Sequence, residues 1–374
     1  MKLSSSVSVL ITGADGFIGQ NLALRMREEG NYEVIKFVRG DSDQYLSDVL
    51  LKVDFVVHLA GENRPKSNDL YAAVNTGLTL KIANILTING LQTPIVFASS
   101  VQATMVNEYG KSKLAAENVL KELSARNGNP VFAFRLPGVF GKWCRPDYNS
   151  VVATFCHNIA NGLPIRVNDK DAPLRLLHID DVVESVLNTI KEIRAGFHYM
   201  TVDNEFHITV GDLANQIKSF HESRSSLISE RVGSGLTRAL YSTYISYLPP
   251  RAFSYSVPSH KDHRGTFVEM LKTKDSGQFS FFTGHPGVTR GGHYHHSKNE
   301  KFLVIQGRAR FGFRNILTDE KYELLTDGEK PQIVETVPGW AHDITNVGND
   351  EMIVMLWANE IFDPKYPDTI PHKI

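Results

Sequence analysis

The stretch Thr12-Gly13-Ala14-Asp15-Gly16-Phe17-Ile18-Gly19 follows a β-branched apolar run and leads into a helical pattern, Leu22–Glu29. In such a strand–turn–helix unit the first glycine permits a tight turn and the second lets the backbone approach a pyrophosphate. The third lets the helix pack closely on the strand. Amide groups and the dipole at the start of a helix favour phosphate oxygens. The stretch therefore predicts a dinucleotide-binding turn, and a glycine-rich turn without a ligand is the structural alternative.

Short buried strands and helices alternate around this turn as far as Ile190, which indicates βαβ units and a parallel sheet. The interval between Val38 and Val53 leaves room for only a short third strand or none. The predicted strands are Val7–Thr12, Tyr32–Val38, Phe55–Ala60, Ile95–Ser99 and Val131–Leu136. The predicted helices are Leu22–Glu29, Tyr71–Asn89, Lys113–Arg126, 182–193 and 211–228.

The pattern changes after an aromatic, proline-interrupted segment, Ser242–Pro258, which we interpret as a linker. Beyond it the apolar period is two, and short strands separated by Gly, Pro, Asn and Asp predict an all-β barrel or jelly roll. Eight of the 14 histidines also lie after residue 250. We therefore expect two domains, 1–247 and 248–374. The predicted barrel strands are Phe279–Thr283, Phe302–Ile305, Ala309–Phe313, Gln332–Thr336 and Met352–Trp357.

Composition excludes several classes of protein. The formal net charge is −1, so no general attraction to nucleic acid or an anionic membrane is expected. Cys144 and Cys156 cannot form a disulfide framework, which favours a reducing compartment. The first residues lack the apolar core of a signal peptide, and no apolar run approaches the ~20 residues that span a bilayer. We expect a soluble, cytoplasmic protein.

Cofactor choice follows from the residue after the second strand. Folds that prefer NAD carry an acidic residue there for the ribose 2′-hydroxyl, whereas this chain has Arg39. A guanidinium suits a 2′-phosphate, so the sequence predicts NADPH. A solvated surface arginine is the alternative.

The run Tyr109-Gly110-Lys111-Ser112-Lys113 carries the catalytic signal. On a helix, Tyr109 and Lys113 share one face, one turn apart. A nearby ammonium would lower the pKa of the tyrosine, ordinarily about 10, and make it a usable proton donor. Ser99-Ser100, at the end of the preceding strand, can hold a substrate carbonyl.

In these features residues 7–240 resemble the extended short-chain dehydrogenase/reductase family, whose members act on nucleotide-linked sugars. The match continues through Asp54–Gly61, Asn75, Arg135–Gly141 and His178–Val182. The resemblance implies a Rossmann-like α/β domain with Ser100, Tyr109 and Lys113 as catalytic triad and Asn149 and Arg175 as substrate-binding residues. Asp48 lies where the third strand is nearly absent and is not assigned to adenine. The implied cofactor-binding residues are Gly13, Gly16, Phe17, Ile18, Gly19, Arg39, Ala60, Asn75 and Lys113.

A metal site is predicted in the second half. His293 and His295 are two residues apart, so on a strand they point to one face, and Glu300 opens the next strand. Together with His342 they can form a compact nitrogen and oxygen site for a divalent metal. Zinc is our prediction, although iron, manganese or nickel would suit the same ligands. Histidines that serve only structure are the alternative.

The spacing of this motif resembles the cupins, with an irregular second motif at Pro338-Gly339. The reductase–cupin order, with Gly141–Ser150 and Tyr241–Pro249, resembles bifunctional enzymes of capsule or O-antigen synthesis. That resemblance implies a homodimer acting on a UDP-linked amino-deoxy sugar. The cupin would epimerise C3 of a UDP-2-acetamido-2,6-dideoxy-4-hexulose, and the reductase would reduce C4 with NADPH to UDP-2-acetamido-2,6-dideoxy-L-talose, on the UDP-N-acetyl-L-fucosamine route.

Three questions stay open at this point. The acid–base groups of the epimerase could include His296, Lys298 or Asp343, and the sequence does not choose among them. The cupin could instead be a non-catalytic dimerisation or sugar-sensing module beside a simple 4-ketoreductase. A non-catalytic NADP-binding regulator is a further alternative, against which the intact Tyr109/Lys113 pair argues.

Overall fold

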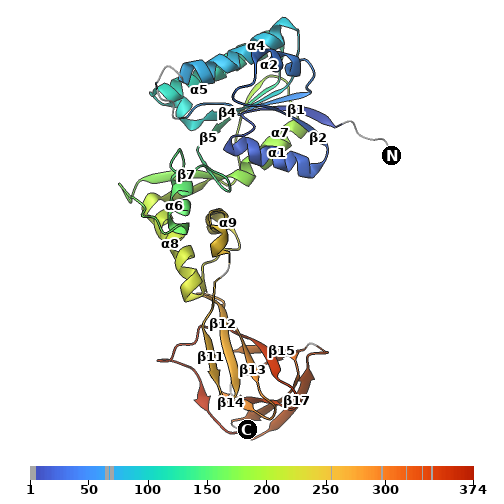
Figure 1. The fold of residues 1–374 in the computed structure, drawn as a ribbon, viewed down its shortest axis with the longest axis vertical. Helices are drawn as coiled ribbons and strands as arrows, with labels where there is room; N and C mark the ends of the chain where they lie inside the picture. The colour runs from blue at the N-terminus through green and yellow to red at the C-terminus, as the bar shows by residue number, and fades with distance from the viewer. Residues whose placement is uncertain are drawn as a thin grey trace, which may run out of the picture. The chain divides into compact units, whose positions relative to one another are not determined.

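A computed structural model describes residues 6–63, 67, 71–253, 255–295, 298–316, 318–330, 332–337 and 340–374. They form two compact units (Figure 1). The first comprises Met1–Ile217 and Ala239–Leu248, and the second comprises Lys218–Arg238 and Pro249–Ile374. Residues 218–238 thus lie with the second unit, whereas the predicted boundary at 247/248 places them in the first domain. The limits of the independently folding domains remain a prediction.

The first unit is built on a six-stranded parallel sheet in the order β2-β1-β3-β4-β5-β8. The predicted parallel sheet is confirmed. In the interval after β2 the chain forms a helix, α2 (Asp43–Leu50), in place of a strand. The strands are β1 (Val7–Thr12), β2 (Tyr32–Phe37), β3 (Phe55–His58), β4 (Ile95–Ser100), β5 (Val131–Leu136) and β8 (Phe197–Met200).

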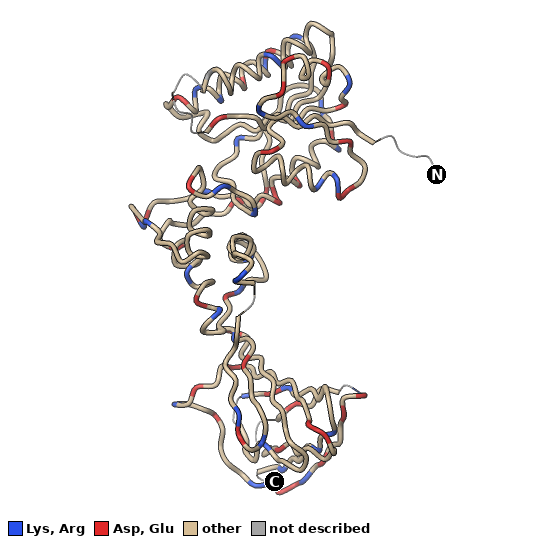
Figure 2. The backbone as a smooth tube through the Cα atoms, in the orientation of Figure 1, with Lys and Arg blue, Asp and Glu red and all other residues tan. Residues whose placement is uncertain are grey.

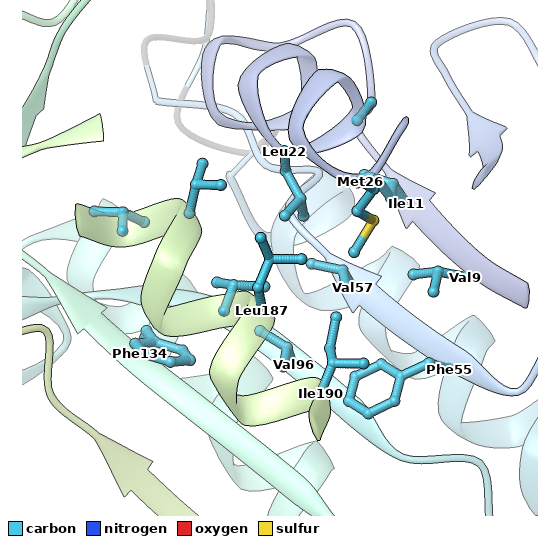
Figure 3. Packing of buried hydrophobic residues seen from close by; sticks show 14 of the residues in the cluster. Val9, Ile11, Leu22, Met26, Phe55, Val57, Val96, Phe134, Leu187 and Ile190 are labelled. Carbon is cyan, nitrogen blue, oxygen red and sulfur yellow. The ribbon is translucent and has the colours of Figure 1, made fainter. Parts of the chain in front are cut away.

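Helices cover both faces of this sheet (Figure 1). Because both faces are buried, the strands are continuous apolar runs and successive residues enter opposite cores. Val9 and Ile11 pack with residues of α1 (Phe17–Glu29) and α7 (Ile179–Lys191) (Figure 3). Leu10, between them, belongs to the cluster on the other face. One layer holds α1 (Phe17–Glu29) and α7 (Ile179–Lys191); the other holds α2, α4 (Gly77–Ile88) and α5 (Glu108–Asn127).

Smaller elements complete the first unit and lead to the second. The start of the predicted linker differs, because residues 242–246 belong to α9 (Gly235–Ser246), whereas its end at Pro258 agrees with the next strand, which begins at Ser259. These elements are η1 (Ala72–Thr76), η2 (Val101–Thr104), β6 (Gly138–Phe140), α6 (Val151–Ala160), β7 (Pro173–His178), β9 (Phe206–Thr209), α8 (Val210–Ser226), α9 (Gly235–Ser246) and η3 (Pro250–Ala252).

The second unit includes the end of α8 and the start of α9, and from Ser259 onward it is all-β. There two facing sheets enclose a core of Phe302, Val304, Phe311, Ile344 and Val354. One sheet holds β10 (Ile228–Ser229), β11 (Ser259–Asp262), β12 (Gly265–Thr273), β13 (Gly277–Gly284), β20 (Met352–Ala358), β15 (Glu300–Gln306) and β18 (Ile333–Glu335). The other holds β17 (Lys321–Asp327), β16 (Arg308–Asn315), β19 (Trp340–Asn346), β14 (Thr289–Tyr294) and β21 (Ile370–Pro371). The predicted α/β domain followed by an all-β domain is confirmed.

Charge is mixed in both units. Figure 2 shows Lys and Arg interspersed with Asp and Glu along the backbone, in keeping with the net charge of −1. Among the described helices, none is both long enough and apolar enough to cross a membrane.

Candidate functional sites

The glycine turn lies at the carboxyl end of β1. Gly13 has φ +70°, and a Cβ there would come within 2.8 Å of the Ala60 backbone, which follows the neighbouring strand β3. A Cβ at Gly19 would meet the Gly13 carbonyl at 2.5 Å. α1 begins at Phe17, directly after Gly16. The close approaches at Gly13 and Gly19 are ones that only glycine allows. The predicted cofactor-binding residues of this region lie together at the carboxyl end of β1: Gly13, Gly16, Phe17, Ile18, Gly19 and Ala60.

Arg39 follows β2 and has a partner that the sequence did not predict. Its guanidinium lies 2.8 Å from the Glu62 carboxylate, and the Tyr148 hydroxyl donates to the other Glu62 oxygen at 2.9 Å. Glu62 also donates its backbone N–H to Asn75. Because β2 and β3 flank β1 in the sheet, the Arg39–Glu62 pair spans the end of β1. Any anion that binds Arg39 competes with this carboxylate.

Tyr109 lies in the first turn of α5, where Asn107 caps the helix by accepting from the Gly110 N–H at 2.8 Å. Burial raises the pKa of Tyr109, and a hydrogen bond with Ser100 opposes that rise. Ser100 is the last residue of β4. The structure thus brings the predicted Ser100 and Tyr109 together.

Lys113 is buried one turn further along α5. Its ammonium donates to the Ala98 carbonyl at 2.8 Å and lies 6.0 Å from the centre of the Tyr109 ring. Burial lowers the pKa of Lys113 to about 8, although the Glu117 charge raises it. The expectation that Lys113 lowers the pKa of Tyr109 is not met here, since burial dominates and the tyrosine pKa is raised. Asn75, predicted to bind cofactor, is buried and donates to Ser112 at 2.9 Å.

A buried ion-pair network behind the triad was missed. The Glu117 carboxylate is fully buried and accepts from Ser99 at 2.5 Å, Arg135 at 2.7 Å and Tyr199 at 2.7 Å. Burial alone would raise the pKa of Glu117, but these partners outweigh it and hold it low. Glu117 ties α5 to β4, β5 and β8. Its position one helical turn after Lys113 was the available signal.

A cavity of about 330 Å³ opens beside Tyr109. Asn149, a predicted substrate residue, lines it, and so do Tyr71, Gln102 and Asn107, which were not predicted. Arg175, also predicted to bind substrate, does not line it. On β7 the guanidinium instead forms a two-bond pair with Glu205, at 2.5 and 2.9 Å.

In the second unit the four predicted metal ligands converge. One ligand atom from each of His293, His295, Glu300 and His342 lies within 4.8 Å of all the others. His293 on β14 pairs in register with His342 on β19, and Glu300 is the first residue of β15. The part of the second cupin motif at Pro338-Gly339 lies outside the described residues.

The surroundings of this cluster fit a divalent ion. Nδ1 of His295 donates a hydrogen bond to the Asp368 carbonyl oxygen at 2.6 Å. This bond directs Nε2 of the same ring toward the Glu300 carboxylate, 3.3 Å away. Both ring nitrogens of buried His342 lack a hydrogen-bond partner among the described residues. Burial and the His342 charge lower the pKa of His293 to about 4, so its ring is neutral, as a metal ligand must be. Burial would raise the pKa of Glu300, but His295 and His342 hold it well below its usual range.

A cavity of about 230 Å³ adjoins the cluster. His293 and Glu300 line it, together with Lys298, Glu360, Phe362 and Thr369. It is large enough for a sugar ring.

Two family models match the chain. The NAD dependent epimerase/dehydratase family matches residues 9–203, which are 195 of 374, and the polysaccharide biosynthesis C-terminal domain matches residues 260–370. The chain belongs to the NAD-dependent epimerase/dehydratase family. Membership of this family implies a nicotinamide cofactor.

Full-length relatives of this epimerase/dehydratase family member share both units. The UDP-2-acetamido-2,6-β-L-arabino-hexul-4-ose reductase of Pseudomonas aeruginosa is 56% identical over 363 residues, 97% of this chain and 98% of the relative. The capsular polysaccharide assembling protein CapF of Staphylococcus aureus is 40% identical, with a TM-score of 0.90 over 98% of this chain and 100% of that chain. The predicted resemblance to a two-domain capsule-synthesis protein is confirmed. MoeE5, solved with UDP-glucose and NAD, is 20% identical with a TM-score of 0.55 over 66% of this chain and 100% of MoeE5, and shares the fold.

Proposed function

We propose that the chain converts a UDP-2-acetamido-2,6-dideoxy-4-hexulose in two steps. The second unit, which we assign to the cupins, epimerises C3, and the first unit then reduces C4 with NADPH to give UDP-2-acetamido-2,6-dideoxy-L-talose. One observation carries the proposal: Ser100 and Tyr109 meet beside one cavity, and a cluster of three histidines and a glutamate adjoins another. The name of the P. aeruginosa relative supports the substrate class.

In the reductase the chain's own residues hold the cofactor and move a proton. The Gly13–Gly19 turn and the start of α1 would hold the pyrophosphate, Arg39 the 2′-phosphate, and Asn75 and Lys113 the ribose and nicotinamide side. NADPH would supply a hydride to C4. Ser100 orients the C4 oxygen by a hydrogen bond, and Tyr109 donates its proton to that oxygen as charge develops there. Asn149 lines the cavity that would receive the sugar nucleotide.

In the second unit His293, His295, Glu300 and His342 would hold a divalent metal, which we assign as zinc. The ion would supply a Lewis acid or a structural link between β14, β15 and β19. Epimerisation itself requires that a C3 proton leave one face and that a proton return to the other.

Carbon acidity fixes the order of the two steps. The C3 hydrogen is acidic only while C4 is a ketone, because the carbonyl accepts the charge that deprotonation leaves. After C4 has become an alcohol, no side chain could abstract that proton. The epimerase must therefore act before the reductase.

The test uses Tyr109→Phe in the full chain. This variant should lose NADPH oxidation yet still exchange the C3 hydrogen of the 4-keto sugar nucleotide with deuterium from solvent, followed by NMR. If the variant retains its metal and binds substrate but shows no C3 exchange, the alternative holds: a 4-ketoreductase beside a non-catalytic barrel. The relative named only as a reductase favours that alternative. The expected homodimer and cytoplasmic location remain predictions.

A further inference from the structure

The structure separates the three acid–base candidates of the epimerase. Asp343 follows His342 on β19, so the two side chains point to opposite faces of the strand. On its own face the Asp343 carboxylate forms an ion pair with Arg310 at 3.2 Å. It does not line the cavity beside the metal cluster. His296 lies outside the described residues. Lys298 lines that cavity.

Lys298 is a buried cation, with 5% of its surface exposed. Its ammonium lies 2.9 Å from the Thr369 hydroxyl and 3.5 Å from the Pro367 carbonyl, and it stands 5.6 Å from the centre of the Phe362 ring. Among the described residues its one ion-pair partner is Glu300, at 3.9 Å, which is long for such a pair.

A bound metal would weaken that pairing, because Glu300 belongs to the candidate ligand cluster and would share its charge with the ion. A buried charge without a close opposite charge costs several kcal/mol. Such a cation on a cavity wall therefore indicates a ligand that carries, or develops, negative charge at that point.

We propose that the Lys298 ammonium binds the C4 oxygen of the 4-keto sugar and stabilises the enolate formed during C3 epimerisation. The proposal rests on the epimerase function assigned above. If His293, His295, Glu300 and His342 all bound the ion, four protein ligands would hold it, whereas a catalytic zinc usually has three and keeps a position open for substrate. A separate electrophile is then needed at C4, and Lys298 supplies it.

The step conserves atoms and electrons. The C3–H bond breaks, its electron pair forms the C3=C4 double bond, and the carbonyl π pair moves to the C4 oxygen, where Lys298 donates a hydrogen bond. The proton passes to a carboxylate on the cavity wall, for which Glu360 is the described candidate outside the metal cluster. The enolate then collapses, C3 takes a solvent-derived proton on the opposite face, and the C4 carbonyl re-forms.

The test compares Lys298→Met with Lys301→Met, a matched lysine on β15 whose ammonium pairs with Glu335 and is half exposed. The probe is the 4-keto sugar nucleotide, and the readout is C3 deuterium exchange by NMR. Lys298→Met should lose about 100-fold or more of the exchange rate, the usual cost of removing an oxyanion donor. Lys301→Met should exchange like the wild type.

Two further measurements exclude a merely structural effect. Metal content by elemental analysis should be unchanged in Lys298→Met, as should the reverse reaction of the other unit, oxidation of UDP-2-acetamido-2,6-dideoxy-L-talose by NADP⁺. Lys298→Arg, which keeps the charge, should recover part of the exchange. Wild-type exchange in Lys298→Met overturns this inference, and so does exchange lost only in parallel with metal. Absence of exchange in the wild type overturns the epimerase function itself.

Discussion

The two candidate sites differ in how their buried polar groups are satisfied. In the first unit Lys113, Asn75 and Glu117 each have hydrogen-bond partners within the chain. In the second, both ring nitrogens of buried His342 lack one among the described residues. Since unpaired buried polar groups cost about 1–3 kcal/mol each, the first site is organised by the chain itself. We expect a bound ion to complete the second.

The sites also differ in where their residues come from. Ser100, Tyr109 and Lys113 lie on β4 and α5, which only the short turn η2 separates, and helix spacing alone relates Tyr109 to Lys113. In the metal cluster the register of β14 and β19 joins His293 to His342, far along the chain, and Glu300 comes from β15 of the other sheet. A substitution in the first site should therefore lower the reaction rate. A substitution in the second should lower the metal content and make the barrel less ordered.

The largest effect is expected for Tyr109→Phe. Loss of a general acid costs about 10²–10⁴-fold, so NADPH oxidation should fall by about 100-fold or more, measured by absorbance at saturating substrate. Metal content should not change. A residual rate close to that of the wild type would contradict the role of Tyr109 and with it the contrast between the two sites.

Next in size is the effect of His342→Ala on the metal. We expect about one divalent ion per chain in the wild type and a loss of roughly tenfold or more in affinity when a ligand is removed. Asp343→Asn, on the other face of β19, is the control and should keep the ion. Elemental analysis and competition with a chelator measure both. A wild type free of metal throughout purification would refute the site.

Much of this could be predicted from sequence, because periodicity reports burial. The parallel sheet, the Gly13–Gly19 turn and the grouping of His293, His295 and Glu300 follow from local spacing, whereas the distant His342 was predicted from the resemblance to the cupins. Three features could not be predicted: the Glu117 network, the Arg39–Glu62 pair and the pairing of Arg175 with Glu205. Each joins residues that are distant in sequence and meet only through sheet order. The pKa of Tyr109 differed for a related reason, since burial, which spacing does not report, raises it more than the hydrogen bond with Ser100 lowers it.

A smaller effect should appear in the pH dependence of reduction. Lys113 acts as an ammonium, and burial lowers its pKa from 10.5 to about 8. The value of kcat/KM should therefore fall as pH rises through about 8, where the charge is lost. Its titratable neighbours are Tyr109 and Glu117 on α5 and His58 on β3; the pKa of His58 is lowered to about 3 by burial, so its ring stays neutral throughout.

Glu117→Gln sharpens this prediction. The Glu117 charge raises the pKa of Lys113. Its removal should therefore lower that pKa, so that kcat/KM falls at a lower pH than in the wild type. Tyr199→Phe removes one hydrogen bond to Glu117 but keeps the carboxylate, so kcat/KM should fall at the same pH as in the wild type. If the pH at which kcat/KM falls is unchanged in Glu117→Gln, or shifts equally in both variants, the Glu117 network serves structure alone.

The smallest effect concerns cofactor choice, because Arg39 is exposed and already has a partner. A charge-assisted hydrogen bond to a 2′-phosphate favours NADPH over NADH by about 1 kcal/mol or more, roughly fivefold. That gain is limited because the phosphate must displace the Glu62 carboxylate, 2.8 Å from the guanidinium. Arg39→Ala should therefore lower kcat/KM for NADPH about fivefold and leave the value for NADH nearly unchanged. Glu62→Gln should instead raise kcat/KM for NADPH, because it removes both the carboxylate that competes for Arg39 and a negative charge that repels the 2′-phosphate. Equal kcat/KM for NADPH and NADH in the wild type would show that Arg39 does not select the cofactor. If the preference for NADPH persists in Arg39→Ala, other residues at the carboxyl end of the sheet determine it.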